Sequence, residues 1–196
     1  MAKKRIAKRP AARLKDIDDE QMTAPQRALR DAIFAGPRGQ RKKLNGPFQI
    51  WLNAPEFGDL AQQLGAHCRY KTGVSPRLSE FAILVTANLW KAQYEWFAHE
   101  PMALKAGIKP QTIKDLKAGR TPKAAAKDER AIYDFIKELY KTRRVSDKNY
   151  KRVVAVLGEP ATVELVGILG YYSLISMTLN VFRAAIPEDA ELPFKE

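Results

Sequence analysis

The fold is decided by the stretch from Arg77 to Gly107, which reads RLSEFAILVTANLWKAQYEWFAHEPMALKAG. The preceding pair Ser75-Pro76 indicates a helix start, because proline fits the first turn of a helix. Gly107 is typical of the position just after a helix end. Polar and aromatic side chains that can form a site gather in the second half of the stretch: Trp90, Gln93, Tyr94, Glu95, Trp96 and His99.

Glu80 and His99 can meet only if this stretch does not form one straight helix. Nineteen residues separate them, which corresponds to roughly 28 Å along a helix that rises about 1.5 Å per residue. Asn is a poor residue inside a helix and a good cap, so we predict a break at Asn88 to Lys91. Glu95, in contrast, lies one turn from His99 on the same helical face.

The rest of the chain also predicts helices, and no segment has the alternating pattern of a strand. We therefore predict an all-α fold. The last helix is expected from Ala161 to Ala184, separated by Gly158-Glu-Pro160 from a helix that Ser146 caps. Its fifteen residues from Leu165 to Leu179 carry no charge, but a membrane span needs about 20. A central or subunit-interface helix is predicted, and no membrane partner. The other expected helices cover residues 26–35, 47–52, 56–70, 110–117 and 126–142.

Charge and length predict one helical domain, residues 16–196, after a basic mobile tail, residues 1–15. The net charge is +12, and seven positive residues precede the first acid, Asp16; subtracting those seven leaves +5. A tail of this kind can bind polyanions, so we expect nucleic-acid binding to be non-specific, if there is any. The single cysteine, Cys68, excludes an internal disulfide, and a reducing cytoplasm is the expected location.

Several motifs in and next to the stretch from Arg77 to Gly107 resemble the signature of the carboxymuconolactone decarboxylase family, which includes the alkylhydroperoxidase-D-like proteins. The matching residues are Arg77, Glu80, Tyr94-Glu95-Trp96, His99 and Ala106-Gly107-Ile108. Segments on either side are similar too, so that about residues 20–185 are covered. The resemblance implies a compact helical domain of the carboxymuconolactone decarboxylase or alkylhydroperoxidase-D-like type. It also implies a homo-oligomer, either a trimer or a hexamer.

This chain departs from the peroxidase branch of that family. The branch uses Cys-x-x-Cys with a His four residues after the second Cys, and those two positions here are Ala92 and Glu95. Neither side chain can form a thiolate or a disulfide. The resemblance is therefore to a branch that lacks the Cys pair, and the missing pair opposes a peroxiredoxin activity by this route.

Four residues are candidates for acid–base catalysis. His99 can carry a proton near neutral pH, and Glu95 or Glu80 can orient its ring and raise its pKa. Tyr94 can donate a hydrogen bond to a developing oxyanion. A structural role is equally open: Glu80 can pair with Arg77 at i,i+3, and His99 can satisfy a buried polar group.

Substrate-binding candidates come from two sources. A cation can bind a substrate carboxylate, and the sequence offers Arg77 or Lys91, with arginine able to form a bidentate fork. Trp90 is either a substrate platform or a core residue. The resemblance implies that the region around residues 47–55 lines the substrate cavity, which adds Phe48, Trp51 and Asn53, although core packing is the favoured interpretation of these residues.

Three functions remain open at this level. The first is a decarboxylase-like lyase that acts on a small carboxylated or lactone substrate. The second is the peroxiredoxin or antioxidant activity of the family. The third is a non-enzymatic oligomer that binds an anionic partner through its basic tail. We expect no cofactor and no metal, because His67 and His99 are the only histidines and have no ligand-like spacing.

Overall fold

The part of the computed structural model that is described, residues 10–39 and 43–195, forms eight α-helices and contains no strand. A short 3₁₀ turn at Asp19–Gln21 precedes them. The prediction of an all-α fold is confirmed. The helices are α1 (Ala24–Ala35), α2 (Pro47–Trp51), α3 (Pro55–Tyr70), α4 (Pro76–Trp90), α5 (Gln93–Lys105), α6 (Pro110–Lys117), α7 (Lys127–Thr142) and α8 (Asp147–Phe182).

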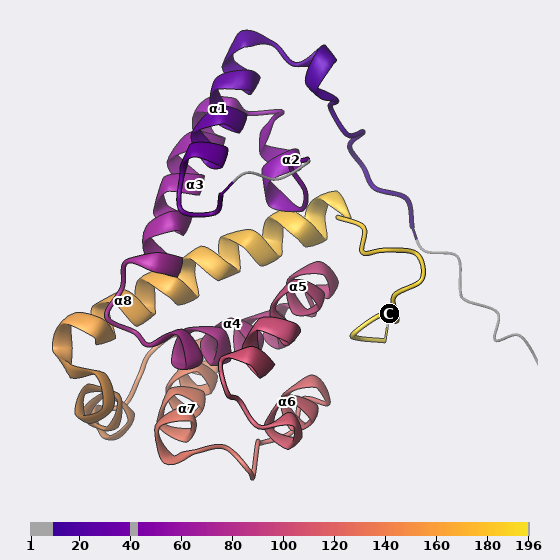
Figure 1. The fold of residues 1–196 in the computed structure, drawn as a ribbon. Helices are drawn as coiled ribbons and strands as arrows, with labels where there is room; N and C mark the ends of the chain where they lie inside the picture. Colours follow the sequence, from indigo (N-terminus) through magenta and orange to yellow (C-terminus); the bar gives the residue numbers. More distant parts are fainter. Residues whose placement is uncertain (1–9, 40–42, 196) are drawn as a thin grey trace, which may run out of the picture.

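Helix α8 runs across the middle of the fold, with α1 to α3 on one side and α4 to α7 on the other (Figure 1). Helix α4 packs against α8, α5, α7 and α6. Every residue of α4 from Leu78 to Asn88 is buried. Most of these side chains are apolar, and a helix of this kind is covered at the centre of a bundle. The candidate site therefore lies where α3 and α8 meet the hairpin of α4 and α5.

The predicted break between Glu80 and His99 is confirmed. Helix α4 ends at Trp90, Lys91 adopts the left-handed conformation with φ 50° and ψ 37°, and α5 begins at Gln93. Asn88 does not act as the expected cap, because its side-chain amide donates to the Lys117 carbonyl oxygen at 3.2 Å. The chain instead reverses through Lys91, whose left-handed backbone is a conformation that ends many helices.

Helix α8 contains the interruption that the sequence indicates. Gly158 has φ 77° and ψ 167°, which is not helical, so two helices meet at this residue. The second part ends at Phe182, two residues before the predicted end, because Arg183 turns into the left-handed region. By length and composition alone this helix could cross a membrane, with 33% of its most apolar window buried, and one such helix is weak evidence. The expectation of no membrane partner stays a prediction.

Part of the predicted basic tail has a definite place in the fold. Residues 1–9 lie outside the described residues. Arg13 donates from its backbone N–H to the Phe182 carbonyl oxygen at 3.0 Å and from Nη1 to the Val181 carbonyl oxygen at 2.7 Å. These two bonds satisfy carbonyl groups that the end of a helix leaves without a helical partner. The segment around Arg13 therefore lies against the end of α8.

Candidate active site

The hairpin of α4 and α5 brings His99 between two carboxylates. His99 Nδ1 donates to Glu80 Oε2 at 2.6 Å, across the break, and His99 Nε2 lies 3.0 Å from Glu95 Oε1, one turn away on the same helix. All three side chains are buried. The predicted convergence of Glu80, Glu95 and His99 is therefore what the structure shows, and both ring nitrogens face an acid.

Arg69 on α3 contacts this cluster through Glu80 and Tyr172. Its Nη2 lies 3.4 Å from Glu80 Oε1, and its Nη1 donates to Tyr172 OH at 3.4 Å. Tyr172, from α8, packs edge-on against the His99 ring with centroids 5.3 Å apart. Four helices thus contribute to the cluster, which fixes the orientation of the imidazole ring.

The two carboxylates change the acidity of His99. Burial lowers the pKa of the imidazolium, but the charge of Glu95 and the hydrogen bond to Glu80 outweigh it and raise the pKa of His99 to about 9. Near neutral pH the ring is therefore protonated at both nitrogens. The cluster of Glu80, Glu95, His99 and Arg69 then contains two positive and two negative groups.

We expect the unfolding free energy to fall as the pH rises from about 6.5 to about 9. Below the unfolded-state pKa of about 6.5 the proton is bound in both states, and the ion pairs contribute fully. As the pH passes the folded-state pKa of about 9, the folded protein loses the proton and that contribution disappears. Between these two pH values the unfolding free energy should fall by an amount on the order of 3 kcal/mol. Urea unfolding at several pH values measures it.

Two variants separate this effect from other titrations. His99→Gln should lack the pH dependence, whereas His67→Gln, which changes the exposed histidine on α3, should keep it. Identical pH dependence in the wild type and in His99→Gln would show that His99 is not the group responsible.

A cavity of about 140 Å³ opens beside His99 and Glu95. An apolar cavity of about 150 Å³ in another protein binds benzene, so this volume suits a molecule the size of one six-membered ring. One phenylalanine, four tyrosines and two arginines contribute to its walls. The lining residues are Arg38, Asn45, Pro47, Phe48, Arg69, Tyr70, Tyr94, Glu95, Ala98, His99, Met102, Tyr171, Tyr172 and Ile175.

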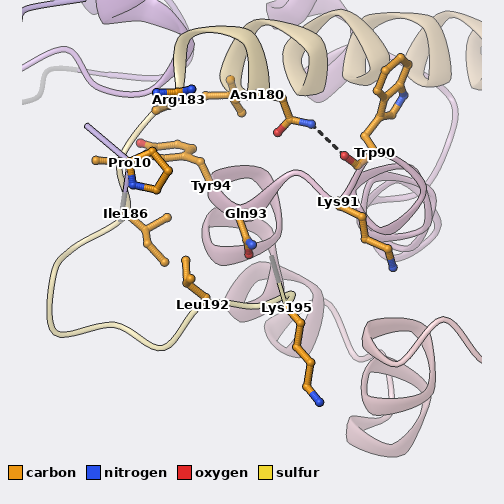
Figure 2. Close-up of a pocket in the computed structure, with 13 residues that line it drawn as sticks. Pro10, Trp90, Lys91, Gln93, Tyr94, Asn180, Arg183, Ile186, Leu192 and Lys195 are labelled. Carbon is orange, nitrogen blue, oxygen red and sulfur yellow. Dashed lines mark hydrogen bonds between the residues drawn. The ribbon is translucent and has the colours of Figure 1, made fainter. Parts of the chain in front are cut away.

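A larger cavity of about 400 Å³ lies next to it, and Tyr94 lines both. Figure 2 shows this second cavity between Asn180 and Arg183 at the end of α8 and the C-terminal segment that contains Ile186, Leu192 and Lys195. None of the residues of the His99 cluster lines it. His99 and Glu95 therefore face the smaller cavity and not the larger one.

The predicted substrate-binding residues do not all line the same cavity. Phe48 lines the cavity beside His99, together with the predicted catalytic residues Tyr94, Glu95 and His99. Glu80 does not line it and lies behind the imidazole ring. Trp90 and Lys91 line the larger cavity instead, and Lys91 Nζ lies 4.9 Å from the centroid of the Phe194 ring.

Three other predicted residues do not line the cavity and have structural partners instead. Arg77 donates from Nη1 to Glu129 Oε1 at 2.6 Å and also pairs with Asp128 on α7, so neither the predicted pair with Glu80 nor a free guanidinium exists. Trp51 is buried with its ring edge-on to Phe48. Asn53 is exposed and donates to the Ile50 carbonyl oxygen at 3.0 Å, which closes the end of α2.

The sequence analysis missed Arg38, Arg69, Tyr171 and Tyr172 as site residues. Arg69 follows Cys68 on α3, and nothing in the local pattern shows that its side chain points toward α4. One signal was present at Gly65, a glycine inside a predicted helix. A Cβ built there would lie 1.9 Å from Tyr171 OH and 2.8 Å from Arg38 Nη2, so the bare backbone makes room for both groups.

Comparisons with known proteins support the fold. No protein-family model matches the chain, and no curated protein matches it. A crystal structure of a protein of unknown function from Agrobacterium tumefaciens, which carries the provisional name "antioxidant defence protein AhpD", is similar with a TM-score of 0.65. The match has 15% sequence identity and covers 74% of this chain and 100% of the other. This chain therefore has the all-α fold of the alkylhydroperoxidase-D-like proteins.

Proposed function

We propose that this protein is an acid–base enzyme of the carboxymuconolactone decarboxylase kind, a lyase that acts on a small carboxylated or lactone substrate. The observation that carries the proposal is the Glu80–His99–Glu95 arrangement at the wall of a ring-sized cavity. A buried histidine with a perturbed pKa in a concave site is a candidate for proton transfer.

The positions of the three residues relative to the cavity support a different role for each. Glu95 and His99 face the cavity, whereas Glu80 lies behind the ring and orients it. Loss of CO₂ leaves an electron pair on a substrate carbon that must take up a proton. That proton comes from His99 Nε2, directly or through Glu95 Oε1, which lies 3.0 Å from it. Tyr94 at the cavity wall can donate to a developing oxyanion.

Peroxide reduction by a dithiol has less support. Its two motif positions are Ala92 and Glu95, and Glu95 belongs to the acid–base cluster. Cys68 is the only thiol in the chain; it is buried, and burial raises its pKa above the ordinary value, which makes a thiolate scarce. The antioxidant name of the similar structure is therefore not the activity that we propose here.

The experiment combines a substrate panel with one conservative substitution. Small lactones and unsaturated carboxylic acids are incubated with the protein in D₂O, and NMR detects product and deuterium bound to carbon. We expect turnover of at least one compound, reduced at least about 100-fold in Glu95→Gln. Glu100→Gln is the matched control, because Glu100 is on the same helix but pairs with Trp96 and Lys117.

The same variants test the coupling without a substrate. Glu95→Gln removes the charge that contributes most to raising the His99 pKa, so an NMR titration should show a lower pKa than in the wild type and in Glu100→Gln. Equal pKa values in all three proteins, or full turnover by Glu95→Gln, would refute the acid–base role of Glu95.

We also propose that the chain forms a homo-oligomer. Large apolar side chains are exposed on α8 and α3, including Val163 at 72% and Leu60 at 70% of their surface. Contiguous exposed apolar surface marks interaction sites in soluble proteins. Light scattering that shows a monomer at micromolar concentration would count against this proposal.

A further inference from the structure

We propose that Arg38 and Tyr171 form an anion subsite of the cavity beside His99, and that this subsite selects ring-sized monocarboxylates. The inference deepens the proposed function and rests on it only for the role of Glu95. Binding of the carboxylate at Arg38 is a separate property that can be measured with a ligand that does not react.

The first step of the argument is the balance of charges. Arg69 pairs with Glu80, and His99 lies between Glu80 and Glu95, so these four groups carry no net charge when the imidazole is protonated. Arg38 is the remaining charged residue that lines the cavity. Among the described residues, no carboxylate forms an ion pair with it. The cavity therefore has one unmatched positive charge, which a monoanion would neutralise.

The second step is that the Arg38 guanidinium has a fixed position. Its Nη1 donates to the Gln62 carbonyl oxygen at 3.2 Å and to Gln62 Oε1 at 3.4 Å. The Gln62 amide is fixed in turn by Asp59 Oδ1 at 3.0 Å. The guanidinium carbon lies 4.9 Å from the centroid of the Phe48 ring, a distance at which cation–π attraction acts. An oriented fork of this kind suits a carboxylate.

Gly65 allows Tyr171 OH to lie next to this guanidinium. Both groups contact the bare backbone of Gly65 at positions that a Cβ would occupy. Burial raises the pKa of Tyr171, although Arg38 acts in the opposite direction, so the hydroxyl stays neutral and keeps its proton near neutral pH. Arg38 and Tyr171 thus present neighbouring donors at the cavity wall.

The third step concerns Glu95, which also lines the cavity and excludes a second carboxylate. Glu95 is 3% exposed. Its Oε1 lies 3.0 Å from His99 Nε2, and Glu95 lines the cavity. A ligand carboxylate placed beside this buried carboxylate would be repelled by the like charge. The ligand therefore binds with its carboxylate at Arg38 and with an uncharged part next to Glu95.

Benzoate, benzamide and phthalate test the subsite. They are, respectively, a ring-sized monoanion, a neutral molecule of nearly the same shape, and a dianion. Calorimetric titration of the full-length protein near pH 7 measures their dissociation constants. We expect benzoate to bind more tightly than benzamide and phthalate. Arg38→Gln should weaken benzoate binding about 10- to 100-fold, the range for a hydrogen bond to a charged group, and should leave benzamide binding unchanged.

Two further variants make the result specific. Arg144→Gln removes one positive charge from an exposed position, so it controls for the overall charge and should bind benzoate like the wild type. Tyr171→Phe keeps the ring and loses the hydroxyl, and should weaken benzoate binding about 2- to 10-fold. If Arg38→Gln does not fold, Tyr171→Phe still tests the subsite, because it removes the other donor.

The outcomes separate this subsite from the proposed reaction. Glu95→Gln should bind benzoate at least as tightly as the wild type, even though it is expected to lose turnover. The subsite is overturned if the wild type prefers benzamide, or if Arg38→Gln and Tyr171→Phe bind benzoate like the wild type. Full turnover by Glu95→Gln together with Arg38-dependent benzoate binding would overturn the reaction and leave the subsite in place.

Discussion

Replacing His99 by glutamine should lower kcat/KM by about 10²- to 10⁴-fold, the usual contribution of general acid–base catalysis. Glutamine can still donate one hydrogen bond to Glu80, but it cannot carry a proton to substrate. Because His99 is charged near neutral pH in the folded protein, the substitution also removes the positive partner of two buried carboxylates. Circular dichroism must therefore show that the variant is folded before its rate is interpreted.

The pH profile distinguishes a catalytic role of His99 from a structural one. In the wild type, the rate should depend on a group with a pKa of about 9, and this dependence should vanish in His99→Gln. His67→Gln is the matched control, since His67 is exposed and lies outside the cavity lining. A turnover of His99→Gln within threefold of the wild type would contradict the proposed reaction.

Replacing Arg77 by alanine should reduce the unfolding free energy by about 3 kcal/mol, near the lower end of the range for breaking a buried ion pair. Glu129 is 3% exposed, and its Oε1 would lose the guanidinium at 2.6 Å. Its Oε2 would keep the bond from the Ala126 N–H at 2.9 Å. The Arg77 side chain is 31% exposed, so water would screen part of the loss.

Urea unfolding measures the effect of Arg77→Ala, with Arg130→Ala as the control. Arg130 pairs with Asp134 on the surface of α7, and such pairs contribute about 1 kcal/mol or less. Benzoate affinity should be unchanged in Arg77→Ala, because Arg77 does not line the cavity. Unchanged stability combined with lost benzoate binding would restore the interpretation of Arg77 as a substrate-binding residue.

The meeting of Glu80 with His99 could be predicted because it follows from helix geometry along one stretch of chain. The separation is too long for contact within one helix, and Asn88 to Lys91 offers an interruption. The predicted position of the interruption is confirmed, but its predicted cause is wrong. The pattern indicated a capping role for Asn88, whereas Asn88 contacts α6 and Lys91 makes the turn.

The partners of the arginines could not be predicted in the same way. A long flexible side chain reaches several neighbours, and the choice depends on which helix packs beside it. Arg77 was expected to bind substrate, but α7 brings Asp128 and Glu129 to it. Arg38 and Tyr171 are more than a hundred residues apart in the chain. Arg38 follows α1 and donates to Gln62 on α3, and α3 packs against α8, which carries Tyr171. These contacts bring the two residues to one cavity.

The turn at Lys91 limits which mutations the site tolerates. A single residue in the left-handed conformation, followed by Ala92, joins the two helices that carry the acids and the histidine. One residue added in α5 before Glu95 would turn every later side chain by about 100° about the helix axis and carry His99 away from Glu80. A substitution at this turn leaves the number of residues between Glu80 and His99 unchanged, whereas an insertion in α5 before Glu95 changes it and separates the two side chains.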